Sequence, residues 1–102
     1  MYAGVVVYDL KPGKKADASR IWKEIFVPAV KRQSSFKGAL WLTAPDADKA
    51  IGIELWDIDL AASAFETSGL FQQLLEKFKP VLAKTPERQE YSALQVAEPV
   101  SE

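Results

Sequence analysis

The chain has 102 residues, which is enough for one hydrophobic core. With 48% hydrophobic and 26% charged residues it has the composition of a soluble globular protein. Thirteen basic and fourteen acidic residues give a net charge of -1, which disfavours nucleic acid and anionic membranes as partners. Cysteine and histidine are both absent, which excludes disulfides, thiolate or imidazole metal sites and nucleophiles activated by histidine.

The start of the chain carries no targeting pattern. No apolar run approaches the roughly 20 residues that span a bilayer. The first cationic residue, Lys11, follows the first apolar run, whereas a secretory signal begins with its basic residues. We therefore expect a cytoplasmic protein that has no membrane partner.

The first half of the chain predicts a strand, a helix and a hairpin. Residues 2–8 are β-branched and aromatic, as in a strand. Apolar residues recur every three or four positions over residues 14–33, which predicts an amphipathic helix whose last turn is kinked or separated by Pro28. Residues 36–43 and 50–56 read as two strands joined by a tight turn around Pro45 and Asp46.

The second half predicts a helix and a last strand. Asp57 or Asp59 is expected to cap the helix through its side chain, and Gly69 and Pro80 mark a break and an end. Residues 84–88 form a connector and residues 89–97 a fourth strand. We take residues 1–97 as one domain and residues 98–102 as a polar tail.

This order of elements, βαββαβ, defines the α+β, ferredoxin-like fold. Right-handed crossovers place the first and third strands in the centre of a four-stranded antiparallel sheet, with the second and fourth at its edges.

Both faces of this sheet are apolar, although helices cover only one. An uncovered apolar face would exceed the few hundred square ångströms that a monomer usually exposes. We therefore predict a homodimer in which two sheets pack back to back. The residues expected to face the partner are Val5, Val7, Ile51, Ile53 and Leu55. The alternative assignment exchanges the two faces.

The opposite face carries the candidate ligand site. Glycines in central strands leave space above a sheet, which aromatic rings can turn into a pocket. The expected pocket residues are Gly4, Val6, Trp22 and Gly52. Alternatively, the glycines let a helix approach closely, Trp56 fills the core, and Trp22 with Phe26 is core as well.

Glu54 is the most informative single residue, because a carboxylate in a central strand must be hydrated, paired or protonated. A raised pKa would suit a general base. The alternative is a structural salt bridge to a helix residue such as Arg20 or Lys23. Tyr8 is expected to donate its phenol to a ligand carbonyl or, alternatively, to reach solvent at the strand end.

Two acidic pairs do not predict a metal site. Asp46 and Asp48 fall in the hairpin turn, and Asp57 and Asp59 at the start of a helix, where turn and cap chemistry accounts for them.

Four short motifs resemble the antibiotic biosynthesis monooxygenase-like family of dimeric α/β barrels. They are Lys11-Pro12-Gly13, Phe36-Lys37-Gly38, Glu54-Leu55-Trp56 and Ser68-Gly69-Leu70-Phe71. The resemblance implies two back-to-back sheets and a small-molecule cavity between sheet and helices in each subunit. It also implies either cofactor-free oxygenation of polycyclic phenols or haem degradation. The haem-degrading branch needs a histidine on the second helix, which this chain lacks. Trp56 matches the family, whereas Gly52 stands where some members carry an amide.

The leading hypothesis is a monooxygenase that needs no cofactor and acts on a small aromatic, phenolic or enolic compound. Glu54 would be the base, Trp56 would stack on the substrate ring, and Tyr8 would orient an oxygen. The alternatives are a non-catalytic dimer that binds a small molecule and a dimeric interaction domain without a ligand.

Overall fold

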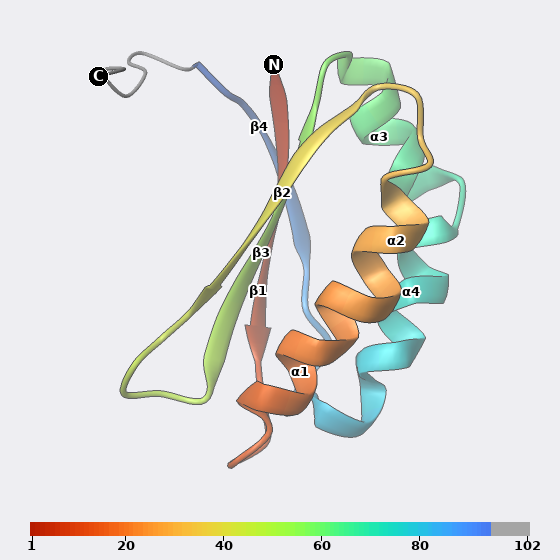
Figure 1. The fold of residues 1–102 in the computed structure, drawn as a ribbon. Coiled ribbons are helices and arrows are strands. Elements are labelled where there is room, and N and C mark those ends of the chain that lie inside the picture. Colours follow the sequence, from red (N-terminus) through yellow and green to blue (C-terminus); the bar gives the residue numbers. More distant parts are fainter. Residues whose placement is uncertain (95–102) are drawn as a thin grey trace.

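The computed structural model describes residues 1–94 and contains a four-stranded antiparallel sheet. The strands are β1 (Tyr2–Asp9), β2 (Phe36–Thr43), β3 (Lys49–Trp56) and β4 (Arg88–Ser92). Their order across the sheet is β2-β3-β1-β4, so β1 and β3 are central, as the sequence predicts. The helices all lie on one side of the sheet (Figure 1). The chain therefore has the predicted α+β, ferredoxin-like fold.

The helical segments form two groups, one in each crossover between strands. The first consists of α1 (Lys15–Ile21), a π-helical turn η1 (Trp22–Phe26) and α2 (Val27–Val30). The second consists of α3 (Asp59–Thr67), α4 (Leu70–Phe78) and a 3₁₀ turn η2 (Lys79–Val81). Within residues 1–94, no helix is both long enough and apolar enough to cross a membrane.

Proline explains the irregular turn in the first helical group. Pro28 has no N–H to donate to the carbonyl of Glu24, so the regular α-helical ladder cannot continue through this point. The helix widens just before it, and the N–H of Val27 bonds to the carbonyl of Trp22, five residues back. The predicted disturbance at Pro28 thus takes the form of a π turn that starts at Trp22.

The second helical group divides at Gly69, as predicted. Gly69 has a φ of 88°, a left-handed conformation that glycine adopts without a steric penalty. The predicted side-chain cap is wrong. Ile58 occupies the N-cap position of α3, with no side-chain cap hydrogen bond from the described part of the chain. Asp59 lies instead in the first turn, where a negative charge interacts favourably with the helix dipole.

The last strand is shorter than predicted. It begins at Arg88, inside the expected connector, and ends at Ser92, so Ala93 and Leu94 are not part of it. The remainder of the predicted strand, residues 95–97, and the predicted tail, residues 98–102, lie outside the described residues.

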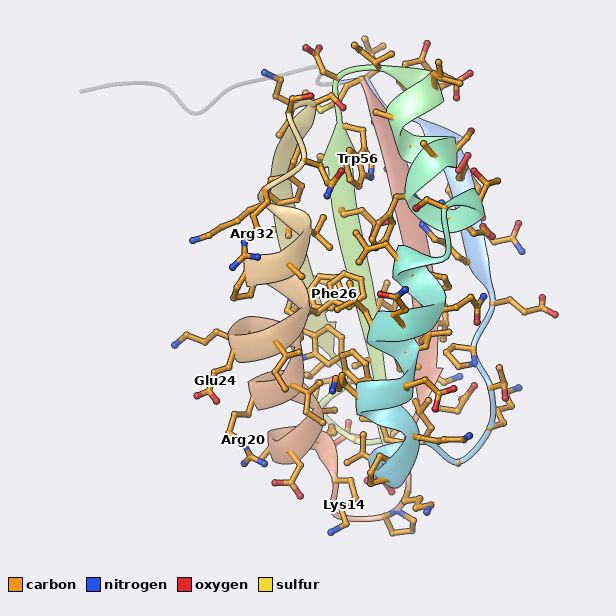
Figure 2. All side chains as sticks on the ribbon, turned by 90° about the vertical axis from the view of Figure 1, so that its right-hand side faces the viewer. Lys14, Arg20, Glu24, Phe26, Arg32 and Trp56 are labelled. Carbon is orange, nitrogen blue, oxygen red and sulfur yellow. The ribbon has the colours of Figure 1, made fainter. Side chains whose placement is uncertain are left out.

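The core lies between the sheet and the two helical groups and is rich in aromatic rings. Phe26 and Trp56 point into this layer, whereas Arg20, Glu24 and Arg32 project away from it (Figure 2). The fully buried large side chains are Trp56, Tyr8, Phe26, Phe71, Phe78, Glu54, Val6 and Val30. Because a glutamate is among them, this layer is a candidate for the functional site.

We expect Gly52→Ala to destabilise the fold. A Cβ at position 52 would lie 2.6 Å from Cζ3 and 2.8 Å from Cη2 of Trp22, so the whole indole would have to shift and lose packing contacts. Overpacking of this kind costs about 1–3 kcal/mol. Urea unfolding measures the loss of stability. The loss caused by Gly52→Ala should be smaller in a Trp22→Leu variant than in the parent protein. An equal loss in both would show that the Trp22 indole is not the obstacle.

Candidate functional site

The three predicted catalytic residues lie on the helix-covered face of the sheet. Tyr8 and Glu54 are 0% exposed and Trp56 is 1% exposed. Glu54 lies opposite Gly4 in the β1–β3 register, and Trp56 lies opposite Tyr2. The idea that Tyr8 reaches solvent is therefore wrong, because α4 covers this end of β1 and the Tyr8 ring stacks on Phe78 at 4.9 Å.

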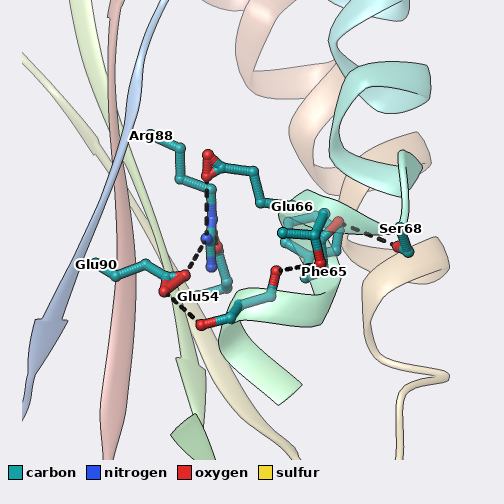
Figure 3. A network of polar contacts seen from close by, with 8 residues as sticks. Glu54, Phe65, Glu66, Ser68, Arg88 and Glu90 are labelled. Carbon is teal, nitrogen blue, oxygen red and sulfur yellow. Dashed lines mark hydrogen bonds and ion pairs between the residues drawn. The ribbon is translucent and has the colours of Figure 1, made fainter. Parts of the chain in front are cut away.

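Glu54 forms a buried ion pair, but with neither of the predicted helix residues. Nε of Arg88 donates a hydrogen bond of 2.6 Å to its Oε1. Arg20 instead pairs with Asp17 on the surface. Nη1 of Arg88 is also 2.9 Å from Glu90 and 3.8 Å from Glu66, so three carboxylates surround one guanidinium (Figure 3).

Gly4 makes room for this ion pair. A Cβ at position 4 would overlap Oε1 of Glu54 and come within hard contact of the Arg88 guanidinium. The guanidinium also lies over the Phe65 ring, 5.3 Å from its centroid. The pair is therefore enclosed by β1 below and α3 above.

Burial controls the ionisation of both acids. It raises the pKa of the Glu54 carboxyl, and this outweighs the opposing effects of the Arg88 charge and hydrogen bond and of the nearby Trp56 indole. Burial, followed by the charge of Glu54, also raises the pKa of the Tyr8 phenol. Tyr8 is thus a hydrogen-bond donor at neutral pH, and Glu54 is a stronger base than an exposed glutamate.

Four buried polar atoms near this pair find no hydrogen-bond partner within residues 1–94. They are Tyr8 OH, Glu54 Oε2, Trp56 Nε1 and Arg88 Nη2. A buried polar group left unpaired costs about 1–3 kcal/mol, and native proteins contain few of them. We call these four residues the buried polar cluster. Their unpaired atoms are groups to which a ligand could bind.

The space predicted above the glycines is occupied. The Glu54–Arg88 pair fills it at Gly4, and the Trp22 indole fills it at Gly52. Val6 is 0% exposed in the core. Of the four predicted pocket residues, Trp22 is the one that lines an open pocket.

That open pocket lies between the first helical group and β2 and has a volume of about 440 Å³. We call it the outer pocket. It is lined by Ser19, Trp22, Lys23, Val27, Phe36, Ala39 and Trp41. Trp41 stacks on Trp22 with 5.1 Å between ring centroids, and its Nε1 donates a 2.8 Å hydrogen bond to Ser19 Oγ. The lining is aromatic and largely apolar, with one cation at Lys23.

Two residues of the site are not singled out by the sequence. Arg88 falls in the predicted connector, although a carboxylate in a central strand calls for a cation on a neighbouring strand, and β4 begins with one. Trp41 falls in a predicted strand. It alternates with Leu40 and Leu42, and this alternation places it on the helix-covered face.

No helix of residues 1–94 packs on the other face of the sheet (Figure 1). The five predicted interface residues lie on it, beside Leu40 and Leu42 of β2 and beside Gln89 and Tyr91 of β4. We call this the open sheet face; its residues are Val5, Val7, Leu40, Leu42, Ile51, Ile53, Leu55 and Tyr91. Leu40 is 53% exposed, Leu42 47% and Tyr91 55%.

One member of each acidic pair has a partner from another part of the chain. Asp48 Oδ1 accepts a 3.3 Å hydrogen bond from the Gly13 N–H, which links the hairpin turn to the loop after β1. Asp57 forms a 3.7 Å ion pair with Lys37. Among the described residues, no three acidic side chains are grouped as a metal site requires.

The architecture is similar to that of solved structures, several of which are named as monooxygenases or oxygenases. A putative antibiotic biosynthesis monooxygenase from Bordetella bronchiseptica superposes with a TM-score of 0.77, covering 92% of this chain and 97% of that one at 16% identity. SnoaB, a cofactor-independent oxygenase from Streptomyces nogalater, gives 0.74 over 93% and 94% of the chains at 18% identity. The ActVA-Orf6 monooxygenase of Streptomyces coelicolor, in complex with nanaomycin D, gives 0.72 over 97% and 92% at 13% identity.

No family model matches the sequence, and no curated protein is significantly similar to it. At these identities the likeness concerns the fold. The chain thus has the fold of the antibiotic biosynthesis monooxygenases, and the resemblance noted in the sequence is confirmed at that level.

We expect Arg88→Met to cost about 3–5 kcal/mol, because it leaves the Glu54 carboxylate buried without its partner. Glu54→Gln should cost less, since Arg88 keeps Glu90 and Glu66. Urea unfolding of both variants at neutral pH tests which of them loses more stability. Equal losses, or a larger loss in Glu54→Gln, would contradict the assignment of the pair.

The raised pKa of Glu54 also predicts a pH dependence. In the unfolded state Glu54 has its ordinary pKa of 4.5 and releases its proton above that pH, whereas the folded state still holds the proton. The free energy of unfolding therefore falls as the pH rises from 4.5 toward the raised pKa. Glu54→Gln lacks this loss. The unfolding free energy of Glu54→Gln relative to the parent should therefore increase with pH through this window, and a decrease would contradict the direction of the shift.

Proposed function

We propose that the chain is a cofactor-independent monooxygenase acting on a small aromatic, phenolic or enolic compound held between the sheet and the helices. The observation that carries the proposal is a buried carboxylate of raised pKa in a cluster of unpaired polar atoms beside an aromatic pocket. The shared fold with SnoaB, a cofactor-independent oxygenase, supports it.

In the proposed reaction Glu54 acts as the general base. It removes a proton from the substrate, and the resulting anion gives one electron to O₂ to form a radical pair. Recombination forms a C–O bond, and the returning proton gives a hydroperoxide. Loss of water then leaves a carbonyl, so that for an anthrone R₂CH₂ and O₂ become R₂C=O and H₂O. The electrons come from the substrate alone.

The other groups of the cluster would bind and orient the substrate. The phenol of Tyr8 remains protonated and can donate to a substrate oxygen. Nη2 of Arg88 can stabilise the developing oxyanion, while Nε holds the Glu54 carboxylate in position. Trp56 is proposed to contact the substrate ring from the far end of the cluster.

Oxygen uptake with a panel of hydroquinones and anthrones tests the activity. We expect uptake by the parent and a loss of at least a hundredfold in Glu54→Gln, the range that one general base supplies. Glu24→Gln, an exposed change of the same chemistry on η1, is the matched control and should retain full uptake. No uptake by the parent above Glu54→Gln would end this proposal.

A second candidate is non-catalytic binding of a small aromatic molecule. It is favoured by the Glu54–Arg88 pair itself, because the Glu54 carboxylate already accepts a hydrogen bond from Arg88 Nε and is less free to accept a substrate proton. Saturable quenching of tryptophan fluorescence by these aromatic compounds, without oxygen uptake, would identify a binding protein.

We further propose that two copies associate through the open sheet face. Its central residues are aliphatic, and the exposed leucines of β2 extend the same surface. Burial of apolar surface contributes about 25 cal/mol per Å², and an isologous pairing covers the patch on both copies at once. The result would be a homodimer with back-to-back sheets.

Replacing both Leu40 and Leu42 by glutamate should raise the dissociation constant of this dimer at least a hundredfold, because like charges would meet in an apolar interface. Sedimentation equilibrium measures the change. Leu60→Glu is the control: Leu60 is 77% exposed on α3, on the other side of the sheet, and its replacement should leave the dimer intact. A parent that sediments as a monomer at micromolar concentration would refute the assembly.

A further inference from the structure

We propose that the Trp22 indole is a movable partition between the outer pocket and the buried polar cluster. Its displacement joins the two into one site for a planar aromatic molecule whose leading edge carries a hydroxyl or carbonyl oxygen. The inference rests on the proposed function for its ligand class but concerns binding, and it is tested without turnover.

Trp22 contacts both compartments. One side of its indole lines the outer pocket. The other side reaches over Gly52, where Cζ3 and Cη2 take the space that a side chain would need, and Cε2 of Tyr8 borders the same space. Trp41 also lines the outer pocket and packs on Tyr8 with 5.4 Å between ring centroids, so the two indoles together separate the outer pocket from Tyr8.

The inner compartment provides the chemistry that attracts such a ligand. Tyr8 OH, Trp56 Nε1 and Arg88 Nη2 are hydrogen-bond donors that form no well-aligned hydrogen bond within residues 1–94, although the Trp56 indole lies near the Glu54 carboxyl. A hydroxyl or carbonyl oxygen on the ligand supplies the missing acceptor. A hydroxyl can also donate to Glu54 Oε2, the fourth unpaired atom.

The attachment of Trp22 differs from that of its neighbour Trp41. Both rings line the outer pocket, but the Trp41 indole is fixed by its hydrogen bond to Ser19. In the part of the chain described, Trp22 has no side-chain hydrogen bond and is held by stacking on Phe26 at 4.3 Å and on Trp41 at 5.1 Å. A flat ligand ring can replace those stacking contacts.

The backbone at Trp22 is also unusual. Trp22 is the first residue of the π turn that Pro28 imposes, and π turns within α-helices are rare and frequently found at functional sites. Trp22 is 4% exposed, so its ring is held by packing without a hydrogen bond, and a ligand ring that replaces this packing can displace it.

The first test observes the parent protein labelled with 5-fluorotryptophan, whose three ¹⁹F resonances are assigned with single Trp→Phe variants. On titration with 1-naphthol, the proposal expects the Trp22 and Trp56 resonances to shift together and saturably. Shifts confined to Trp22 and Trp41, the two rings that line the outer pocket, would mean that the ligand stays there, and this result or no shift at all would overturn the proposal.

The second test compares 1-naphthol with 1-methylnaphthalene, which has the same shape but no oxygen. Trp22→Ala removes the partition, so it should bind 1-naphthol at least tenfold more tightly than 1-methylnaphthalene by calorimetry. Adding Tyr8→Phe should abolish most of this preference. Val27→Ala, which enlarges the outer pocket and keeps Trp22, is the matched control, and its preference for 1-naphthol should not exceed that of the parent protein.

Equal affinity of Trp22→Ala for the two compounds would mean a simple apolar cavity and would refute the partition. The labelled parent protein gives its answer even if Trp22→Ala does not fold. Binding without oxygen uptake would leave the partition standing while refuting the monooxygenase, so the two proposals fail separately.

Discussion

The buried ion pair between Glu54 and Arg88 constrains much of this structure. It joins the central strand β3 to the edge strand β4 across β1, and it requires the intervening residue, Gly4, to have no side chain. Phe65 and Glu66 of α3 close over the guanidinium. A buried pair of this kind contributes little net stability, because desolvation offsets the attraction. Its value lies in fixing which groups face one another.

This arrangement holds a carboxylate in a state that is useful for chemistry. Arg88 keeps Glu54 oriented, while burial keeps its pKa raised, so the carboxyl is both positioned and basic. Water would hydrate the unpaired atoms of the cluster and weaken these effects, and Trp22 stands between them and the outer pocket. The aromatic core therefore helps to set the electrostatics of the site as well as the stability of the fold.

The sequence predicted the strands, their order and the two faces of the sheet, because apolar alternation and turn residues are local signals. Glu54 could be singled out for the same reason, as a charge within an apolar strand. Its partner could not be found in this way. Arg88 lies thirty-four positions away in a short polar edge strand, and only the register of β4 against β1 brings them together. The side-chain cap of α3 failed because Ile58, and not an aspartate, takes the N-cap position.

Three residues break the local rules of their own elements: Pro28 within a helix, Gly52 within a central strand and Glu54 within a core. Each is unfavourable when considered alone. In the fold they act around one place, since Pro28 imposes the turn that begins at Trp22, Gly52 receives the Trp22 ring, and Glu54 lies two residues along the same face of β3. Natural sequences accept such departures mainly where function requires them. Their convergence favours the layer between β3 and the first helical group as the working part of the molecule, independently of any likeness to other proteins.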